Sequence, residues 1–167
     1  MPKVSRVLLV FALLFPGCGV SVYPYLATND DCSCEQYRVT DEQSGIAYSF
    51  SASYSLHDIM NTRIVVSIQN SGADTLDLSL AYIKITSRNF PYQYNDKFLP
   101  VAVPDIPPGD TRVLHLDGEV EMSGTPDSWV AIAGEELVVT LKGIQERGKQ
   151  VPVQVVRFVP KNPKLSS

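Results

Sequence analysis

The chain has 167 residues, and 14 basic and 18 acidic side chains give it a formal net charge of −4 at pH 7. A chain of this length forms one domain with a buried hydrophobic core. Because the sequence has no clustered basic face, we expect no nucleic-acid partner.

Residues 1–17 have the order of a secretory signal peptide, which is removed from the mature protein. Lys3 and Arg6 supply the basic start, residues 7–15 form an apolar run, and Gly17 is the small residue before Cys18. This ending resembles the lipobox of bacterial lipoproteins. The resemblance implies cleavage before Cys18, a lipid on that cysteine, and contact with a membrane through the N-terminal lipid.

Two other fates of this segment stay open. Cleavage after Gly19 or Ser21 also satisfies the small-x-small rule and would release a soluble secreted or periplasmic protein. An uncleaved anchor is the weakest alternative, since roughly nine apolar residues cover only about half of a ~30 Å hydrocarbon core. We therefore place the protein in the bacterial cell envelope. The residue after Cys18 is Gly19 and not aspartate. In a Gram-negative cell this resembles the pattern of lipoproteins that are sorted to the outer membrane.

Residues 18–36 are predicted to form a flexible tether after the lipidated N-terminus. They contain Pro24 and the polar run Asn29-Asp30-Asp31, and they lack a sustained apolar period. Fully extended, a tether of this length lifts the domain up to ~60 Å from the membrane.

The same segment carries Cys32 and Cys34, which are separated by one serine. Three cysteines are an odd number for an oxidising compartment, and lipidation of Cys18 leaves an even pair. Three arrangements are open to this pair. They are a strained and therefore reducible disulfide, an intermolecular bridge, and a soft-metal site.

Residues 37–160 are predicted to form the folded domain, and residues 161–167 a C-terminal tail. The clearest strand covers residues 46–56, where every even position is apolar and every odd position is serine or alanine. This period of two predicts a strand with one face in the core and a small, polar face outward.

Further strands follow, and turn residues separate them. The apolar phase changes between Leu80 and Ile83, which indicates a bulge or a chain that crosses from one sheet to another. Alternation places His115 on the same face as Val113. The predicted strands include residues 62–68, 76–80, 83–85, 113–116, 137–141 and 151–158.

This layout predicts an all-β fold, an antiparallel β-sandwich of about 7–8 strands. Residues 66–72, the triplet Leu76-Asp77-Leu78 and the turn Pro107-Pro108-Gly109-Asp110-Thr111 resemble the Ig-like modules of many bacterial surface and periplasmic proteins. The resemblance implies an Ig-like β-sandwich. It implies no particular role, because sandwiches host unrelated functions.

No segment carries a recognised catalytic motif. His57 and His115 have no sequence context that identifies a catalytic base. We therefore expect a non-enzymatic protein with no catalytic residue, no metal and no cofactor. A less favoured alternative is a periplasmic copper carrier. Its soft ligands would be His57, Met60, His115, Met122, Cys32 and Cys34.

Residues 90–98 are the best candidate for a binding segment. Tyr92 and Tyr94 lie two positions apart, so an extended chain points both side chains the same way. Tyrosine combines a large contact area with a polar tip, which suits protein or glycan recognition. We expect Tyr92 and Tyr94 to contact a protein or glycan partner, and the alternative is that they pack into the sandwich.

The second candidate function is inhibition of a secreted protease. The strand layout is also similar to that of a small bacterial proteinase-inhibitor family, although the sequence has no diagnostic inhibitory loop. An inhibitor needs a rigid, exposed loop, and residues 102–108 are the best candidate because they contain three of the chain's prolines, Pro104, Pro107 and Pro108.

Overall fold

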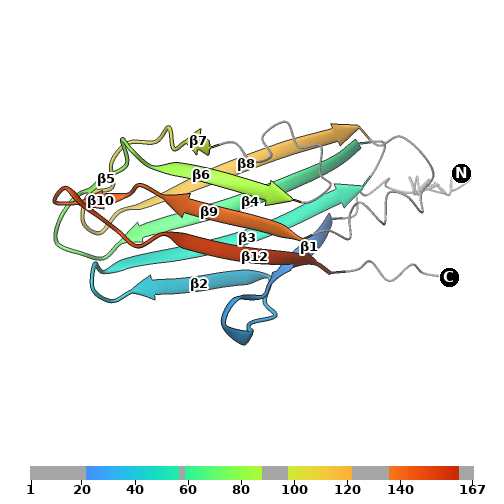
Figure 1. The fold of residues 1–167 in the computed structure, drawn as a ribbon, viewed down its shortest axis with the longest axis horizontal. Helices are drawn as coiled ribbons and strands as arrows, with labels where there is room; N and C mark the ends of the chain where they lie inside the picture. Colours follow the sequence, from blue (N-terminus) through green and yellow to red (C-terminus); the bar gives the residue numbers. More distant parts are fainter. Residues whose placement is uncertain (1–21, 57–58, 88–97, 122–135, 162–167) are drawn as a thin grey trace, which may run out of the picture.

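The structure, a computed structural model, describes residues 22–56, 59–87, 98–121 and 136–161 (Figure 1). Antiparallel strands and one 3₁₀ turn, η1 (Asn29–Asp31), make up the regular structure of these residues. The prediction of an all-β, antiparallel fold is confirmed.

The strands form one large sheet and a small three-stranded sheet. Across the large sheet the order is β7-β6-β9-β12-β1-β3-β4-β8, and β2 pairs with β3; the small sheet has the order β11-β10-β5. In chain order the strands are β1 (Val22–Ala27), β2 (Gln36–Asp41), β3 (Ile46–Leu56), β4 (Ile59–Asn70), β5 (Leu76–Asp77), β6 (Tyr82–Ser87), β7 (Phe98–Pro100), β8 (Thr111–Glu121), β9 (Leu137–Lys142), β10 (Gln145–Glu146), β11 (Lys149–Gln150) and β12 (Gln154–Pro160).

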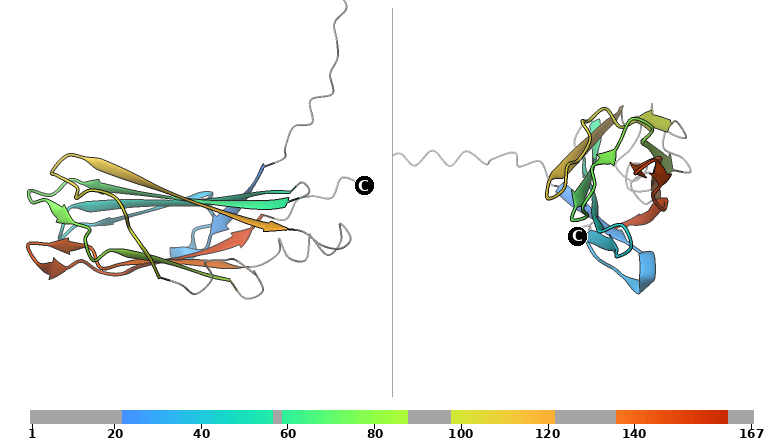
Figure 2. Two further views of the ribbon diagram at one scale, coloured as in Figure 1. Left: turned by 90° about the horizontal axis from the view of Figure 1, so that it is seen from above. Right: turned by 90° about the vertical axis from the view of Figure 1, so that its left-hand side faces the viewer.

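The large sheet curls so that its two halves face each other. The right-hand view of Figure 2, along the long axis, shows β3, β4 and β8 on one side and β6, β9 and β12 on the other. Apolar side chains from both halves fill the space between them and form one hydrophobic core. The two ends of the strand order, β7 and β8, therefore come to lie on the same side of the molecule.

Strand β1 connects the two halves of the sheet. Its first residues, from Val22 to Pro24, pair with β3, and its last residues, from Tyr25 to Ala27, pair with β12. Tyr25 and Ala27 are fully buried. The prediction of a flexible tether over residues 18–36 is therefore wrong from Val22 onward, because Val22–Ala27 form a strand in the centre of the sheet and η1 and the disulfide follow it.

Pro24 and Asn29 explain why this segment looks like a linker in the sequence. The carbonyl of Pro24 accepts a hydrogen bond from the Lys161 amide (3.1 Å), so the missing N–H of the proline does not prevent pairing. The Asn29 side chain bonds the backbone of β12 at Val155 and Arg157 (2.7 and 2.8 Å). The described domain thus begins at Val22 and includes Lys161.

The alternation in residues 46–56 is confirmed where the structure describes it. Ile46, Tyr48, Phe50 and Tyr54 are at most 2 % exposed, and β3 pairs along its whole length with β4. On β4 the same period buries Thr62, Ile64, Val66 and Ile68. The small odd-numbered residues of β3 face outward, as predicted.

The phase change near Leu80 marks a chain crossing, one of the two predicted alternatives. The chain leaves the small sheet after β5, turns at Ser79–Leu80, and enters the opposite half of the large sheet as β6. The last strand, predicted over residues 151–158, begins later in the structure, and Val153 and Val155 are exposed. The pairing of β12 begins only at Gln154, and Val156 and Phe158 supply its buried face.

The two ends of the molecule differ in character. β1 starts at the end where β12, β6 and β8 finish, and Figure 1 shows the start of β1 and the end of β12 on this side. We call it the terminal end. The opposite, distal end holds the turns that follow β2, β4 and β10.

Asn70 organises the distal end. Its side chain is completely buried and donates to the carbonyls of Asp74 (2.7 Å) and Ile106 (2.8 Å). Its side-chain oxygen accepts from the Gly72 amide at 3.0 Å. One asparagine thus fixes the turn after β4 to the loop before β8.

Candidate functional site

Most residues singled out from the sequence lie outside the described residues. This holds for Cys18, His57, Tyr92, Tyr94 and Met122. The prediction that Tyr92 and Tyr94 form a binding surface therefore stays a prediction. Met60 lies in β4, and its side chain is not described.

His115 lies on β8 with its side chain exposed, on the same outer face as Val113. Among the described residues, no three His, Cys, Asp or Glu side chains gather closely enough to hold a metal ion. In that part of the chain there is also no helix long and apolar enough to cross a membrane.

Strand β8 is an edge of the large sheet. In the described part of the chain it pairs only with β4, over eleven residues and without a break in register. The backbone N–H of Asn70 donates to the Asp110 carbonyl (2.9 Å), and this bond shows which residues of the β4–β8 ladder are hydrogen-bonded to each other. Even-numbered residues of β8 therefore bond β4, and Val113, His115 and Asp117 direct their backbone N–H and C=O groups away from the sheet.

An apolar groove of about 260 Å³ runs beside this edge. One wall is β8 from Val113 to Leu116, and the other is the chain that follows β7, from Pro100 to Val103. Ile83 lines it as well. Val113 is 47 % exposed there, although it is an apolar residue within a strand. A backbone edge that no second described strand pairs with and an adjacent apolar groove are the two features that an added strand uses for binding.

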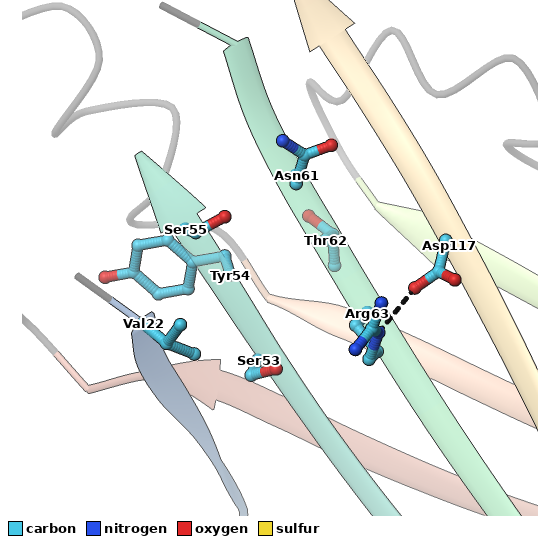
Figure 3. A pocket seen from close by; sticks show the side chains of 8 residues that line it. All are labelled: Val22, Ser53, Tyr54, Ser55, Asn61, Thr62, Arg63 and Asp117. Atoms are coloured by element: carbon cyan, nitrogen blue, oxygen red, sulfur yellow. Dashed lines mark hydrogen bonds and ion pairs between the residues drawn. The ribbon is translucent and has the colours of Figure 1, made fainter. Parts of the chain in front are cut away.

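A second hollow, of about 380 Å³, lies on the outer face of β3 and β4 (Figure 3). The short side chains of Ser53 and Ser55 leave it open, while Val22 and Tyr54 line the side nearest β1. Arg63 forms an ion pair with Asp117 of β8 at 2.7 Å, and this pair closes the far side.

The chemistry of this hollow is that of a polar surface. Hydrogen bonding to Asp117 raises the pKa of the Arg63 guanidinium, which therefore stays charged. Both partners are more than half exposed, so the pair contributes little to stability. The hollow contains no histidine or cysteine, and its single carboxylate is already paired with a cation.

Cys32 and Cys34 form a disulfide, with Cα atoms 5.5 Å apart, in the segment between η1 and β2. Both side chains are half-buried and pack against the edge of the core. The backbone of Cys34 pairs with Ala27 of β1 through two hydrogen bonds of 2.7 and 3.4 Å. The Cys32 amide donates to Asn29, whose side chain holds β12.

This disulfide contributes little to the stability of the fold. In the chain-entropy model a bridge stabilises by restricting the unfolded chain, and the effect grows with the loop that it closes. For a loop of about three residues the model gives about 1.6 kcal/mol, roughly half of the value for a 15-residue loop. The hydrogen bonds around Cys34 and Asn29 hold the segment independently of the bridge.

Residues 102–108, the candidate inhibitory loop, are pinned at both ends. The Val101 amide donates to the Ala81 carbonyl (2.9 Å), and Ile106 exchanges two backbone hydrogen bonds of 3.0 Å with Leu76. Ile106 is fully buried, whereas Ala102 and Pro104 are exposed. The loop thus combines fixed ends with an exposed centre.

Comparison with known proteins leaves the family open. No family model matches the sequence, and no curated protein matches it. A crystal structure of a protein from Archaeoglobus fulgidus matches this chain with a TM-score of 0.42 and 17 % sequence identity. The match covers 70 % of this chain and 96 % of that one.

Proposed function

We propose that this protein is a non-enzymatic lipoprotein of the bacterial cell envelope, an Ig-like β-sandwich that binds an extended segment of a partner protein along β8. The open β8 edge with its apolar groove is the observation that carries the binding role. The two facing halves of the sheet, joined by β1, support the Ig-like description.

The anchor rests on the signal-like N-terminus and Cys18. With β1 starting at Val22, only four residue steps separate Cys18 from the folded domain. At 3.3–3.6 Å per residue this segment reaches about 14 Å when fully extended. The domain therefore lies close to the membrane, and its terminal end faces the membrane. In a Gram-negative cell the membrane is the outer one, and cleavage after Gly19 or Ser21 would instead give a soluble periplasmic or secreted protein.

The anchor is tested by the intact mass of protein extracted from membranes. We expect the mass of a chain that starts at Cys18 plus its acyl groups, and a Cys18→Ser variant that no longer sediments with membranes. A mass that fits cleavage after Gly19 or Ser21 contradicts the anchor.

The chemistry of the edge favours a protein partner over a glycan. Val113, His115 and Asp117 repeat N–H and C=O groups at the spacing of another extended backbone, and a glycan has no such repeat. Mostly apolar side chains line the groove beside the edge, and we expect it to receive apolar side chains of the added strand. We therefore expect a partner segment with alternating apolar residues.

A proline on β8 tests this binding mode. Val113→Pro removes an outward N–H and no bond to β4, and it obstructs an added strand. Thr40→Pro is the matched control, because Thr40 directs its N–H away from β3 on the free edge of β2. The partner is first captured with the unmodified protein by cross-linking in cells, and its recovery is then compared between the two variants.

We expect Val113→Pro to reduce recovery at least tenfold and Thr40→Pro to leave it unchanged, with circular dichroism confirming that both variants fold. Equal recovery with both variants contradicts the assignment of β8. A captured partner that survives protease digestion is a glycan, which contradicts the proposed partner class.

Inhibition of a secreted protease is the second candidate, and the pinned ends of residues 102–108 favour it. A protease inhibitor holds an exposed loop rigid so that little entropy is lost on binding. Ala102 and Pro104 are exposed between the fixed positions Val101 and Ile106. Incubation with a broad panel of secreted proteases tests the idea, and it fails if none is inhibited at stoichiometric concentrations.

A further inference from the structure

We propose that the Cys32–Cys34 disulfide is a site of thiol–disulfide exchange, reversibly reduced by a dithiol protein or small thiol of its compartment. The inference does not depend on the lipid anchor or on the β8 edge. It rests on the position of the pair in the fold, on the small ring that the bridge closes, and on the hydrogen bonds that hold the segment without it.

The small ring that the Cys32–Cys34 bridge closes affects the equilibrium between its oxidised and reduced forms. The free energy that a bridge adds to folding equals the free energy by which folding protects the bridge from reduction. The chain-entropy value for this short loop corresponds to only about a fifteenfold change in the equilibrium constant. Long-range structural disulfides gain much more protection and resist the glutathione pool.

The surrounding hydrogen bonds make the exchange reversible. Ala27 pairs with the backbone of Cys34, and Asn29 connects Cys32 to β12. None of these bonds involves a sulfur atom. After reduction the two thiols therefore stay next to each other and can close the bridge again.

The segment is also accessible. Ser33, between the two cysteines, is exposed, and both cysteines are only half-buried. In Figure 1 the chain between β1 and β2 projects from the lower edge of the sheet. A partner thiol can thus approach without opening the core.

The exchange is a balanced two-electron reaction. A thiolate of the reductant attacks one of the two sulfurs, the Cys32–Cys34 bond breaks, and the released thiolate takes up a proton. A second thiolate of the reductant then attacks the mixed disulfide at the reductant's own sulfur, and the cysteine thiolate that this releases also takes up a proton. The products are a reduced Cys32/Cys34 pair and an oxidised reductant.

The carboxylate of Asp30 gives the site a preference among thiols. Asp30 and Glu35 flank the pair, and each is exposed to solvent. Asp30 accepts a hydrogen bond from the neutral Tyr37 hydroxyl, which leaves its negative charge uncompensated, while Glu35 faces Lys161 at 3.4 Å. An anionic thiol such as glutathione is repelled relative to a cationic one such as cysteamine.

The test is an equilibrium titration of the purified full-length protein with reduced and oxidised glutathione under anaerobic conditions. Thiols are trapped by acid and alkylation. Mass spectrometry of the peptide that contains Cys32 and Cys34 then gives the fraction that is reduced. We expect full reduction by about 10 mM reduced glutathione, conditions that structural disulfides resist. Reduction should leave the circular dichroism unchanged, and oxidised glutathione should restore the bridge.

Two controls sharpen the result. A Cys32→Ser/Cys34→Ser double variant should lose the glutathione-dependent mass change and keep its fold. Cysteamine should reduce the bridge at least threefold faster than glutathione does, after both rates are normalised to a small disulfide in the same buffer. The proposal is overturned if the bridge stays oxidised, if reduction unfolds the domain, or if the two cysteines bridge different molecules.

Discussion

Replacement of Asn70 by alanine should destabilise the domain more than any other polar-to-alanine change at the distal end. The side chain is fully buried and makes three hydrogen bonds, to Asp74, Ile106 and Gly72. Each is worth about 1 kcal/mol, and a buried partner left unsatisfied costs about 1–3 kcal/mol. We therefore expect Asn70→Ala to lower the free energy of unfolding by at least about 3 kcal/mol.

Urea unfolding followed by circular dichroism measures this loss, and the exposed neighbour Gln69 supplies the control. Gln69→Ala should change the stability by less than about 0.5 kcal/mol. For a domain of this size a loss of 3 kcal/mol also lowers Tm by roughly 6–12 °C. A loss below about 1 kcal/mol for Asn70→Ala would mean that water replaces the three bonds, and it would refute the assigned role of Asn70.

Three further predictions concern other parts of the domain. The hydrogen bond to Asp30 raises the pKa of Tyr37 from 10.0 to about 12, so the stabilisation that it gives is complete below pH 10 and is lost as the pH rises through 12. Denaturant titrations from pH 8 to pH 12 should therefore show the stability advantage of the native protein over Tyr37→Phe shrinking, and a constant difference would contradict the assignment. Gly143 and Gly148 both have positive φ, but a Cβ at Gly143 would lie 1.9 Å from the Leu80 carbonyl oxygen, while a Cβ at Gly148 would meet nothing within 4 Å. Gly143→Ala should thus cost well over 2 kcal/mol and Gly148→Ala about 1 kcal/mol, and equal shifts in thermal unfolding would argue against the close approach. Finally, the Cys32→Ser/Cys34→Ser variant should lose no more than about 1.6 kcal/mol in urea unfolding, and a larger loss would make the bridge structural.

The fold class and the core could be predicted from the sequence because one face of each strand lies against the core and the other faces water. In β3 the contrast between Tyr48 or Phe50 and the serines beside them is complete, and the structure buries the aromatic set and leaves the serines half-buried on the outer face. Such alternation is a local property, so it needs no knowledge of which strands are neighbours.

Strand β1 could not be recognised in the same way. Pro24 and the polar residues after Ala27 are typical of a linker, and only the partners of β1, which lie far away in the sequence, make it a strand. The buried role of Asn70 is similar: the turn was predictable from Asn70-Ser71-Gly72, but its bond to Ile106 depends on a distant loop.

The open edge at β8 was also missed, for a related reason. Which strand ends a sheet depends on the order of all strands, and the sequence does not state this order. The signal that could have indicated it is Val113, an apolar residue that alternation assigns to the outer face together with His115.

Amide hydrogen exchange along β8, with and without the captured partner, tests the binding account most directly. In the free protein the amides of Leu114 and Leu116 should be protected by β4, while those of Val113, His115 and Asp117 exchange rapidly. The account predicts that binding protects these three odd-numbered amides and so makes the whole strand slow. Unchanged rapid exchange at Val113, His115 and Asp117 in the bound protein would contradict it.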